Sequence, residues 1–505
     1  MDAVSPRPAD YWKTQIENAL LAPIRAMRWD YLPLLMVYFA YGALGLTGIA
    51  ETFWIKKALT WTPAELAALA VWLALPWTVK MVFGELVDTV PLLGSQRRAY
   101  VFLGASLIAT SFIILAGAAG GWITALPLDA LYVISALLSV TGVVIQDVVA
   151  DAMSTEVVAR VNADGSPRPQ AEIDHDLGMV QVLGRLALSF GIFSVAGVSG
   201  LLAQYMSYQW VFLLGLVVPM ISVSGALLVR LETTEQRPTD LRILGGGIAF
   251  GAFVLALALT RFWLDPDRFV VRFNQEIVFI VSMTVIIAML RRVVGEVDAE
   301  TRKHIFFASI IIFAFRAVPG VGEGYRWFAI DVLGFDEAFY GILQQTGAAI
   351  ALVGAWLLSD LITRKPVATV LLWLTILGTL LSLPTLALVF ELHLVTERLF
   401  GFGARSIALV DEAVSSPLAQ LSMIPLLTLI AIFAPAGHRA TWFALMASLM
   451  NMALVAGSLG TKYLNLLLPV DRNMYGNLRM LVISVIVISL VVPLSAILLF
   501  GRRVR

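Results

Sequence analysis

The 505-residue sequence contains no cysteine and only four histidines. The lack of cysteine excludes disulfides, thiolate metal sites and cysteine nucleophiles. The histidines are not at ligand spacing, so we expect no zinc or haem centre and no catalytic triad. Basic and acidic residues balance at 35 each, which predicts no nucleic-acid partner. The sequence therefore predicts no cofactor and no metal, and it does not favour an enzyme.

Charged residues are also scarce: they make up 14% of the chain, whereas 59% of residues are hydrophobic. Soluble proteins are about a quarter charged and about half apolar. Apolar runs long enough to span a bilayer recur throughout the sequence. We place them near 31–53, 65–88, 99–119, 128–155, 177–204, 209–230, 243–264, 275–291, 303–331, 338–362, 366–391, 404–434, 438–467 and 477–500. This pattern predicts an all-α polytopic membrane protein with about 14 transmembrane helices.

Positive charge is concentrated in alternate loops, for example at 97–98, 291–292 and 364–365. The positive-inside rule makes these loops cytoplasmic and puts both termini on the same side. We expect an integral protein of the cytoplasmic (inner) membrane, with a cytoplasmic N-terminal segment at 1–30 and a cytoplasmic tail at 501–505. Residues 10–28 have the apolar stripe of an interfacial helix, and the alternative is a merely polar tail.

Two stretches in different parts of the chain are similar to each other. Residues 84–98 follow the second apolar run, and residues 354–365 follow the tenth. Each would follow the second helix of a six-helix half if 243–291 is an inserted helix pair. Two similar halves are typical of major-facilitator transporters. We predict a major-facilitator fold with an N-terminal half at 31–231, a linker with two extra helices at 232–302, and a C-terminal half at 303–500.

Four stretches with recognisable motifs occur in order along the chain: 76–100, 147–152, 334–341 and 435–460. Together they resemble the folate–biopterin transporter family of the major facilitator superfamily. The resemblance covers about residues 31–231 and 303–500. It implies a transporter of folate- or pterin-like solutes. The chain departs from the family pattern at Glu85, in the inserted pair, and in the doubled acid Asp411–Glu412.

Two acids and two bases are expected at one membrane depth in the N-terminal half. The helical rise places Asp147 and Asp151 about 16 and 10 Å from the cytoplasmic end of their helix, with Arg185 and Lys80 at similar depths. A charge at the membrane centre costs roughly 2.5–3.5 kcal/mol, so such residues pair or face water. We expect either a pocket floor or proton relay, or a structural ion-pair cluster, with Gln181 on the Arg185 face. On this interpretation Arg185 or Lys80 holds Asp151, and Asp147 acts in coupling or ligand contact.

Glu156 is expected at the membrane edge, beside the loop that carries Arg97 and Arg98. With Asp88 these residues resemble the cytoplasmic charge relay of facilitator proteins. We expect a cytoplasmic gate or a purely structural contact, and no contact with substrate.

The run 303–331 contains Arg316 and Glu323 with a proline and several glycines between them. This composition predicts a broken helix that exposes backbone to a central site. Arginine suits planar carboxylates, and a carboxylate can accept paired hydrogen bonds from the amino edge of a pterin. Arg316, Glu323 and Asp411 are therefore candidate substrate-binding residues. Trp327 could stack on a heterocycle or belong to an interfacial aromatic belt.

Three functional interpretations stay open. The first is a monomeric secondary transporter that binds a pterin- or folate-like solute and protons and works by alternating access. Proton coupling rests on the buried acids and on the absence of a nucleotide-binding motif. The second is a facilitator for another solute. The third is a non-transporting membrane-assembly or pigment-delivery factor, in which the pair 243–291 docks a partner.

Overall fold

The structure is a computed structural model that describes residue 25 and residues 27–503, apart from short gaps. The gaps are 93, 96, 163, 229–238, 266, 296–297, 364–365, 423–424, 427–428 and 431–438. Most of the predicted interfacial helix at 10–28 therefore lies outside the described residues. So do the basic pair 364–365 and the start of the motif at 435–460.

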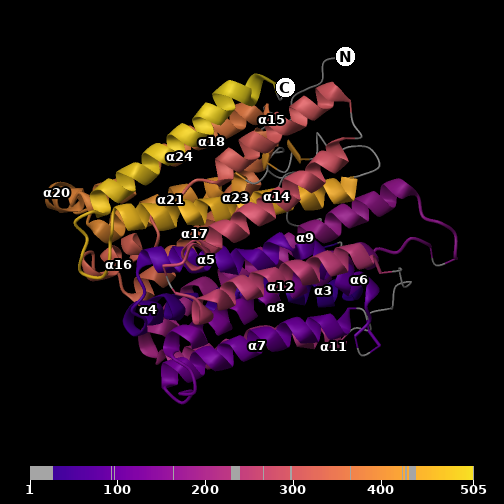
Figure 1. Ribbon diagram of the computed structural model, residues 1–505, viewed down its shortest axis with the longest axis horizontal. Coiled ribbons are helices and arrows are strands. Elements are labelled where there is room, and N and C mark those ends of the chain that lie inside the picture. The colour runs from indigo at the N-terminus through magenta and orange to yellow at the C-terminus, as the bar shows by residue number, and fades with distance from the viewer. Residues whose placement is uncertain are drawn as a thin grey trace. The chain divides into compact units, whose positions relative to one another are not determined.

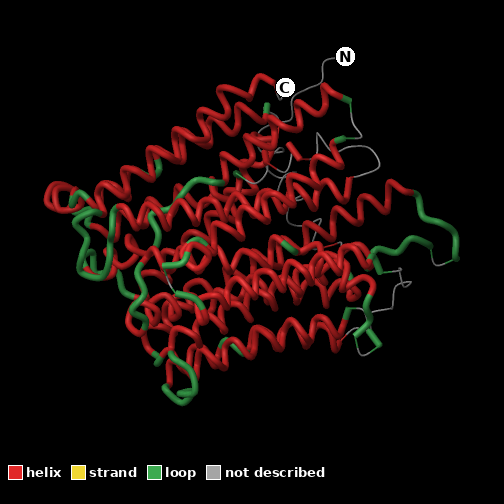
Figure 2. Tube along the Cα trace, viewed as in Figure 1, coloured by secondary structure: helices red, strands yellow, loops and turns green. Residues whose placement is uncertain are grey.

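The regular elements of the described residues are helices joined by loops (Figure 2). Ten helical stretches in this part of the chain are long and apolar enough to cross a membrane. The expectation of an all-α polytopic membrane protein is thus confirmed. The remaining predicted spans contain helices that are shorter, more charged or only partly described, and the count of about 14 stays a prediction.

The chain divides into two compact units. Unit 1 comprises residues 1–51 and 83–239, and unit 2 comprises 52–82 and 240–505. Two of the three boundaries fall within helices, α4 (Gly48–Ala58) and α6 (Lys80–Thr89). The other helices of unit 1 are η2 (Trp29–Tyr31), α3 (Leu32–Ala43), η3 (Leu44–Thr47), α7 (Arg98–Gly120), α8 (Leu128–Glu156), α9 (Gln170–Tyr205), α10 (Tyr208–Leu214) and α11 (Val217–Leu228).

Small residues bring the helices of unit 1 close together. Helices α7, α8 and α11 run side by side (Figure 1). Where α7 crosses α8, a Cβ atom on Gly104 would lie 2.8 Å from the carbonyl oxygen of Gly142. The hydroxyl groups of Ser111 and Ser135 lie 3.1 Å apart in the same interface. Close backbone approach with polar contacts between small residues is typical of membrane helix packing.

Unit 2 contains the remaining helices of the residues that the structure describes. They are α5 (Pro63–Thr78), α12 (Leu241–Trp263), α13 (Phe269–Arg272), α14 (Asn274–Val294), α15 (Ala299–Arg316), α16 (Glu323–Asp331), α17 (Glu337–Thr363), α18 (Val367–Leu380), α19 (Leu383–Val389), α20 (Leu392–Phe400), α21 (Ala404–Leu421), α23 (Arg439–Leu467), α24 (Leu478–Phe500) and η4 (Gly501–Arg503). Helix α5 begins with a capping box: the Thr62 side chain accepts from Glu65 N–H, and Glu65 accepts from Thr62 N–H.

The predicted inserted pair corresponds to α12 and α14, which pack within unit 2. Leu257 of α12 and Val278 of α14 form a cluster with Leu75 of α5. Lys462 of α23 lies 2.8 Å from the Glu276 carboxylate of α14, and both side chains are less than 20% exposed. The Tyr463 hydroxyl donates to the same carboxylate at 2.7 Å. The pair is thus joined to α5 by apolar packing and to α23 by a shielded charge pair.

Arg472, in the loop before α24, holds the end of α4. Its guanidinium donates hydrogen bonds of 2.8 Å to the carbonyl oxygens of Lys56, Leu59 and Trp61. The last carbonyls of a helix have no partner within the helix, and α4 ends at Ala58. Arg472 therefore caps this helix end from a distant part of the sequence.

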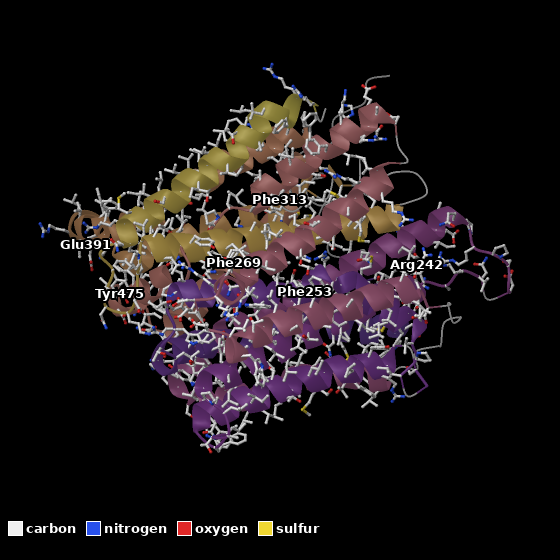
Figure 3. The ribbon with its side chains drawn as sticks, in the orientation of Figure 1. Arg242, Phe253, Phe269, Phe313, Glu391 and Tyr475 are labelled. Carbon is white, nitrogen blue, oxygen red and sulfur yellow. The ribbon has the colours of Figure 1, made fainter. Side chains whose placement is uncertain are left out.

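A second contact reinforces the same region of unit 2. Lys56 of α4 forms an ion pair with Asp331 at the end of α16, and the Tyr475 hydroxyl donates to the other oxygen of that carboxylate. Tyr475 lies at the same end of unit 2 as Glu391, the residue that precedes α20 (Leu392–Phe400) (Figure 3). The end of α4 and the residues after it are thus held to the rest of unit 2 by two segments, the loop before α24 and the end of α16.

Candidate functional site

Asp147 and Asp151 lie on α8, and Asp151 accepts a hydrogen bond from a side chain of α3. The Tyr38 hydroxyl donates to Asp151 Oδ1 at 2.9 Å. Asp147 and Arg185 also interact electrostatically with this hydroxyl, so both charges are near it. Asp151 and Arg185 are exposed and Asp147 is half-buried. These four residues form one polar face, with side chains from α3, α8 and α9.

Gln181 extends this face along α9. Its side-chain amide donates to the Ser154 hydroxyl at 2.8 Å, and that hydroxyl donates to the Asp151 carbonyl oxygen at 2.7 Å. Lys80, predicted in the same layer, belongs to unit 2. The structure therefore brings together Asp147, Asp151, Arg185 and Gln181, and the pairing of Lys80 with them stays a prediction.

The predicted gate residues meet at the C-terminal end of α8, just beyond Asp151. Arg97 is a buried residue, with 5% of its surface exposed. It binds the Glu156 carboxylate at 2.5–3.2 Å, Asp88 Oδ1 at 2.9 Å and the Val87 carbonyl oxygen at 2.8 Å. A planar guanidinium with five N–H donors suits such a cluster. Arg98 has a different contact, since its guanidinium lies 5.6 Å from the centre of the Phe102 ring.

The helix break predicted in 303–331 is confirmed. Helix α15 ends at Arg316, the backbone of 317–322 is not helical, and α16 begins at Glu323. Two side chains of α23 satisfy the exposed backbone. The Thr461 hydroxyl accepts from the Gly320 N–H at 2.9 Å, and the Asn465 amide donates to the Val321 carbonyl oxygen at 3.1 Å. Irregular backbone at membrane depth requires partners of this kind.

The charged residues beside the break have different surroundings. Glu323 forms an ion pair of 3.0 Å with Arg326 on the same helix. Arg316 is half-buried at the C-terminal end of α15, where the helix dipole favours a positive charge. The Tyr340 hydroxyl donates to the Arg326 carbonyl oxygen at 3.5 Å. The break thus carries charges of both signs, and Glu323 is already paired with a base.

Asp411 and Glu412 are adjacent residues of α21, and each contacts a different neighbouring helix. The Thr385 hydroxyl of α19 lies 3.4 Å from Asp411 Oδ2. The Glu412 carboxylate packs where a side chain at Gly347 of α17 would lie. Consecutive residues of a helix point in different directions, so the two acids contact different helices. Asp411 contacts α19, and Glu412 contacts α17.

Trp327 is not available for stacking on a ligand. Its ring is fully buried, and the guanidinium of Arg472 lies 3.9 Å from the ring centre. The interpretation of Trp327 as a stacking platform is therefore wrong, because the ring is enclosed by protein and the Arg472 guanidinium lies against it.

Comparison with known proteins identifies the family. A sequence model of the BT1 family matches residues 42–504. The chain belongs to the BT1 family, the folate–biopterin transporters. A similar curated protein is the folate-biopterin transporter of Synechocystis sp., which is 27% identical over 471 residues, covering 92% of this chain and 80% of that protein. The BT1 chain is thus an integral membrane protein and a transporter, and its family is not one of enzymes.

Solved structures agree on the fold of the BT1 chain. A POT family transporter in complex with 5-aminolevulinic acid superposes with a TM-score of 0.66 at 14% identity, covering 94% of this chain and 96% of that one. The nucleoside transporter NupG superposes with a TM-score of 0.60 at 11% identity, covering 93% and 100%. At such low identity the likeness concerns the fold alone, which is the predicted major-facilitator fold.

Sequence reasoning about the BT1 chain missed three polar residues that the structure brings to these sites. Thr461 and Asn465 are ordinary polar residues of an apolar run, and only the helix break opposite them reveals their role. Tyr38 is one of 12 tyrosines. The sequence did contain one indication of this contact. Gly184 directly precedes Arg185, and a residue without a side chain lets another group, here the Tyr38 ring, pack closely against the helix.

Proposed function

We propose that this protein is a secondary active transporter that moves a folate- or pterin-like solute by alternating access and is driven by protons. The observation that carries the proposal is the polar face of unit 1, where Asp151 and Arg185 remain exposed within membrane-spanning helices. Ionisable groups at membrane depth are costly and persist where they are paired or line a water-filled path.

The chemistry of the candidate residues suits such a solute. A pterin offers a row of N–H donors, and folate adds carboxylates. Asp147 and Asp151 can accept from the N–H edge, whereas Arg185 and Arg316 can bind a carboxylate with a planar pair of donors. Asp411 offers a further acceptor, and Glu323 does so when it releases Arg326.

We assign the Asp88–Arg97–Glu156 cluster to a cytoplasmic gate. The positive loops and the even number of predicted spans support cytoplasmic termini in the cytoplasmic membrane. A buried guanidinium held by two carboxylates is stable while the helices stay together, and it must lose partners when they separate. The cluster would therefore close the path on the cytoplasmic side in one of the alternating states.

Asp147 is our candidate for proton coupling, because it is the deeper acid of the face and is half-buried. The test is uptake of radiolabelled folic acid by cells that express the chain, with and without a protonophore. We expect the protonophore to abolish accumulation, and Asp147→Asn to abolish it while leaving the amount of inserted protein unchanged. Accumulation that survives the protonophore would refute proton coupling, and a fully active Asp147→Asn variant would refute the role of Asp147.

A further inference from the structure

Tyr38 joins three helices of unit 1 at the polar face. Its hydroxyl on α3 donates to Asp151 Oδ1 on α8 at 2.9 Å. Its ring lies against α9, where a Cβ atom on Gly184 would be 2.8 Å from Cε2 of the ring. The ring therefore occupies a space that exists because residue 184 has no side chain.

This contact restricts how the Asp151 carboxylate can be used. A tyrosine hydroxyl has one hydrogen to donate, and here Asp151 receives it. A carboxylate has about four acceptor positions, so the bond to Oδ1 leaves most of the group's capacity for other donors. Asp151 and Arg185 both remain exposed, so the carboxylate is held by Tyr38 and is still accessible.

The surroundings make Tyr38 well suited to orient this acid. A tyrosine ring has only two side-chain torsions, and the edge of the Tyr38 ring packs against α9 at Gly184. The Ser154 hydroxyl is already engaged by Gln181 and by the Asp151 backbone carbonyl oxygen. The Tyr38 hydroxyl, by contrast, donates directly to the Asp151 carboxylate.

We propose that Tyr38 is a positioning residue of the transport site, which holds the Asp151 carboxylate in the orientation that accepts an N–H donor of the solute. Gly184 provides the seat for its ring. The inference rests on the proposed function for the identity of the solute. The orientation of Asp151 by Tyr38 does not depend on that function and can be measured separately.

The first experiment measures uptake of radiolabelled folic acid. Tyr38→Phe keeps the ring and removes the hydroxyl, and we expect the half-saturation concentration to rise about 5- to 20-fold, with the maximal rate changed less than about twofold. In the Asp151→Asn background the same substitution should add little, because the two residues act as one unit. Tyr205→Phe is the matched control, since Tyr205 is 81% exposed.

The second experiment needs no transport and exploits the absence of cysteine. In Asp151→Cys the introduced thiol reacts with a charged methanethiosulfonate as the thiolate. Donation from Tyr38 stabilises the thiolate, so adding Tyr38→Phe should raise the pH of half-maximal reaction by roughly 0.5–1 unit. Gly184→Ala should raise it similarly by displacing the ring, whereas Tyr205→Phe should leave it unchanged.

The two experiments separate the two proposals. No folate uptake by the natural chain, together with the shifted pH profile, would overturn the proposed solute and keep the role of Tyr38. A pH profile that Tyr38→Phe does not shift would overturn the positioning role, whatever the uptake. Additive effects of Tyr38→Phe and Asp151→Asn on half-saturation would also overturn it, because Tyr38 would then act independently of Asp151.

Discussion

Replacing Arg472 tests how firmly the loop before α24 holds the end of α4. Its guanidinium satisfies three carbonyl oxygens at 2.8 Å and lies 3.9 Å from the Trp327 ring centre. The side chain is 22% exposed. Arg472→Ala would leave carbonyl groups without their donor at a largely shielded helix end, and would uncover one face of a buried indole.

The magnitude follows from these contacts. A hydrogen bond to a charged group contributes about 1.5–3 kcal/mol, and a shielded cation–π contact adds about 1–2 kcal/mol. The bonds share one guanidinium and water can replace part of them, so the sum overstates the loss. We expect Arg472→Ala to lower the free energy of unfolding by roughly 3–4 kcal/mol. Arg472→Lys should lose about half as much, because an ammonium keeps the charge and lacks the planar fork.

The assay is thermal unfolding of the purified protein in detergent at a fixed scan rate. Arg479→Ala is the matched control, because Arg479 forms an exposed pair with Glu391 in which both side chains are at least half exposed. Exposed pairs contribute about 0–1 kcal/mol. The reasoning fails if Arg472→Ala lowers the unfolding midpoint no more than Arg479→Ala does.

Two other substitutions test the packing of helices within each unit. Lys462→Met should destabilise the protein by roughly 3–5 kcal/mol, because the shielded Glu276 carboxylate loses its base. Adding Glu276→Gln should restore most of the thermal stability. If it does not, the loss does not arise from an unpaired Glu276 charge. Gly104→Ala should cost about 1–3 kcal/mol or more, because its methyl group would lie 2.8 Å from the Gly142 carbonyl oxygen. Gly245→Ala is the control, because a Cβ atom at Gly245 would have no atom within 4 Å, and it should not lower the stability. Equal yields of folded protein from the two glycine variants would be evidence against the close crossing of α7 and α8.

The positions of the helices could largely be predicted from the sequence. The run 128–155 became α8 (Leu128–Glu156), and the run 477–500 became α24 (Leu478–Phe500). The reason is physical, because a bilayer requires about 20 apolar residues for each crossing. Irregularities within a run left a weaker signal. The run 31–53 contains α3, a 3-10 segment and α4, and α4 continues to Ala58.

The pairing of side chains could be predicted only where both residues belong to recognisable sequence motifs. Arg97 and Glu156 were expected together, and the structure brings them together. Arg472 could not be found in this way, because its partners are backbone carbonyl groups, which every residue has. Tyr38 meets Asp151 across a sequence separation of 113 residues, and the meeting depends on how closely α3 approaches α9. Helix packing, which the sequence pattern does not specify, decides such contacts.

The central claim is that the chain itself moves a folate- or pterin-like solute. The most direct test is uptake of radiolabelled folic acid into liposomes that contain only the purified protein, under an imposed proton gradient. We predict saturable uptake that exceeds that of protein-free liposomes, is competed by unlabelled biopterin, and disappears when the gradient is collapsed. Uptake equal to that of protein-free liposomes for gradients of either direction, from protein that unfolds cooperatively, would contradict the claim.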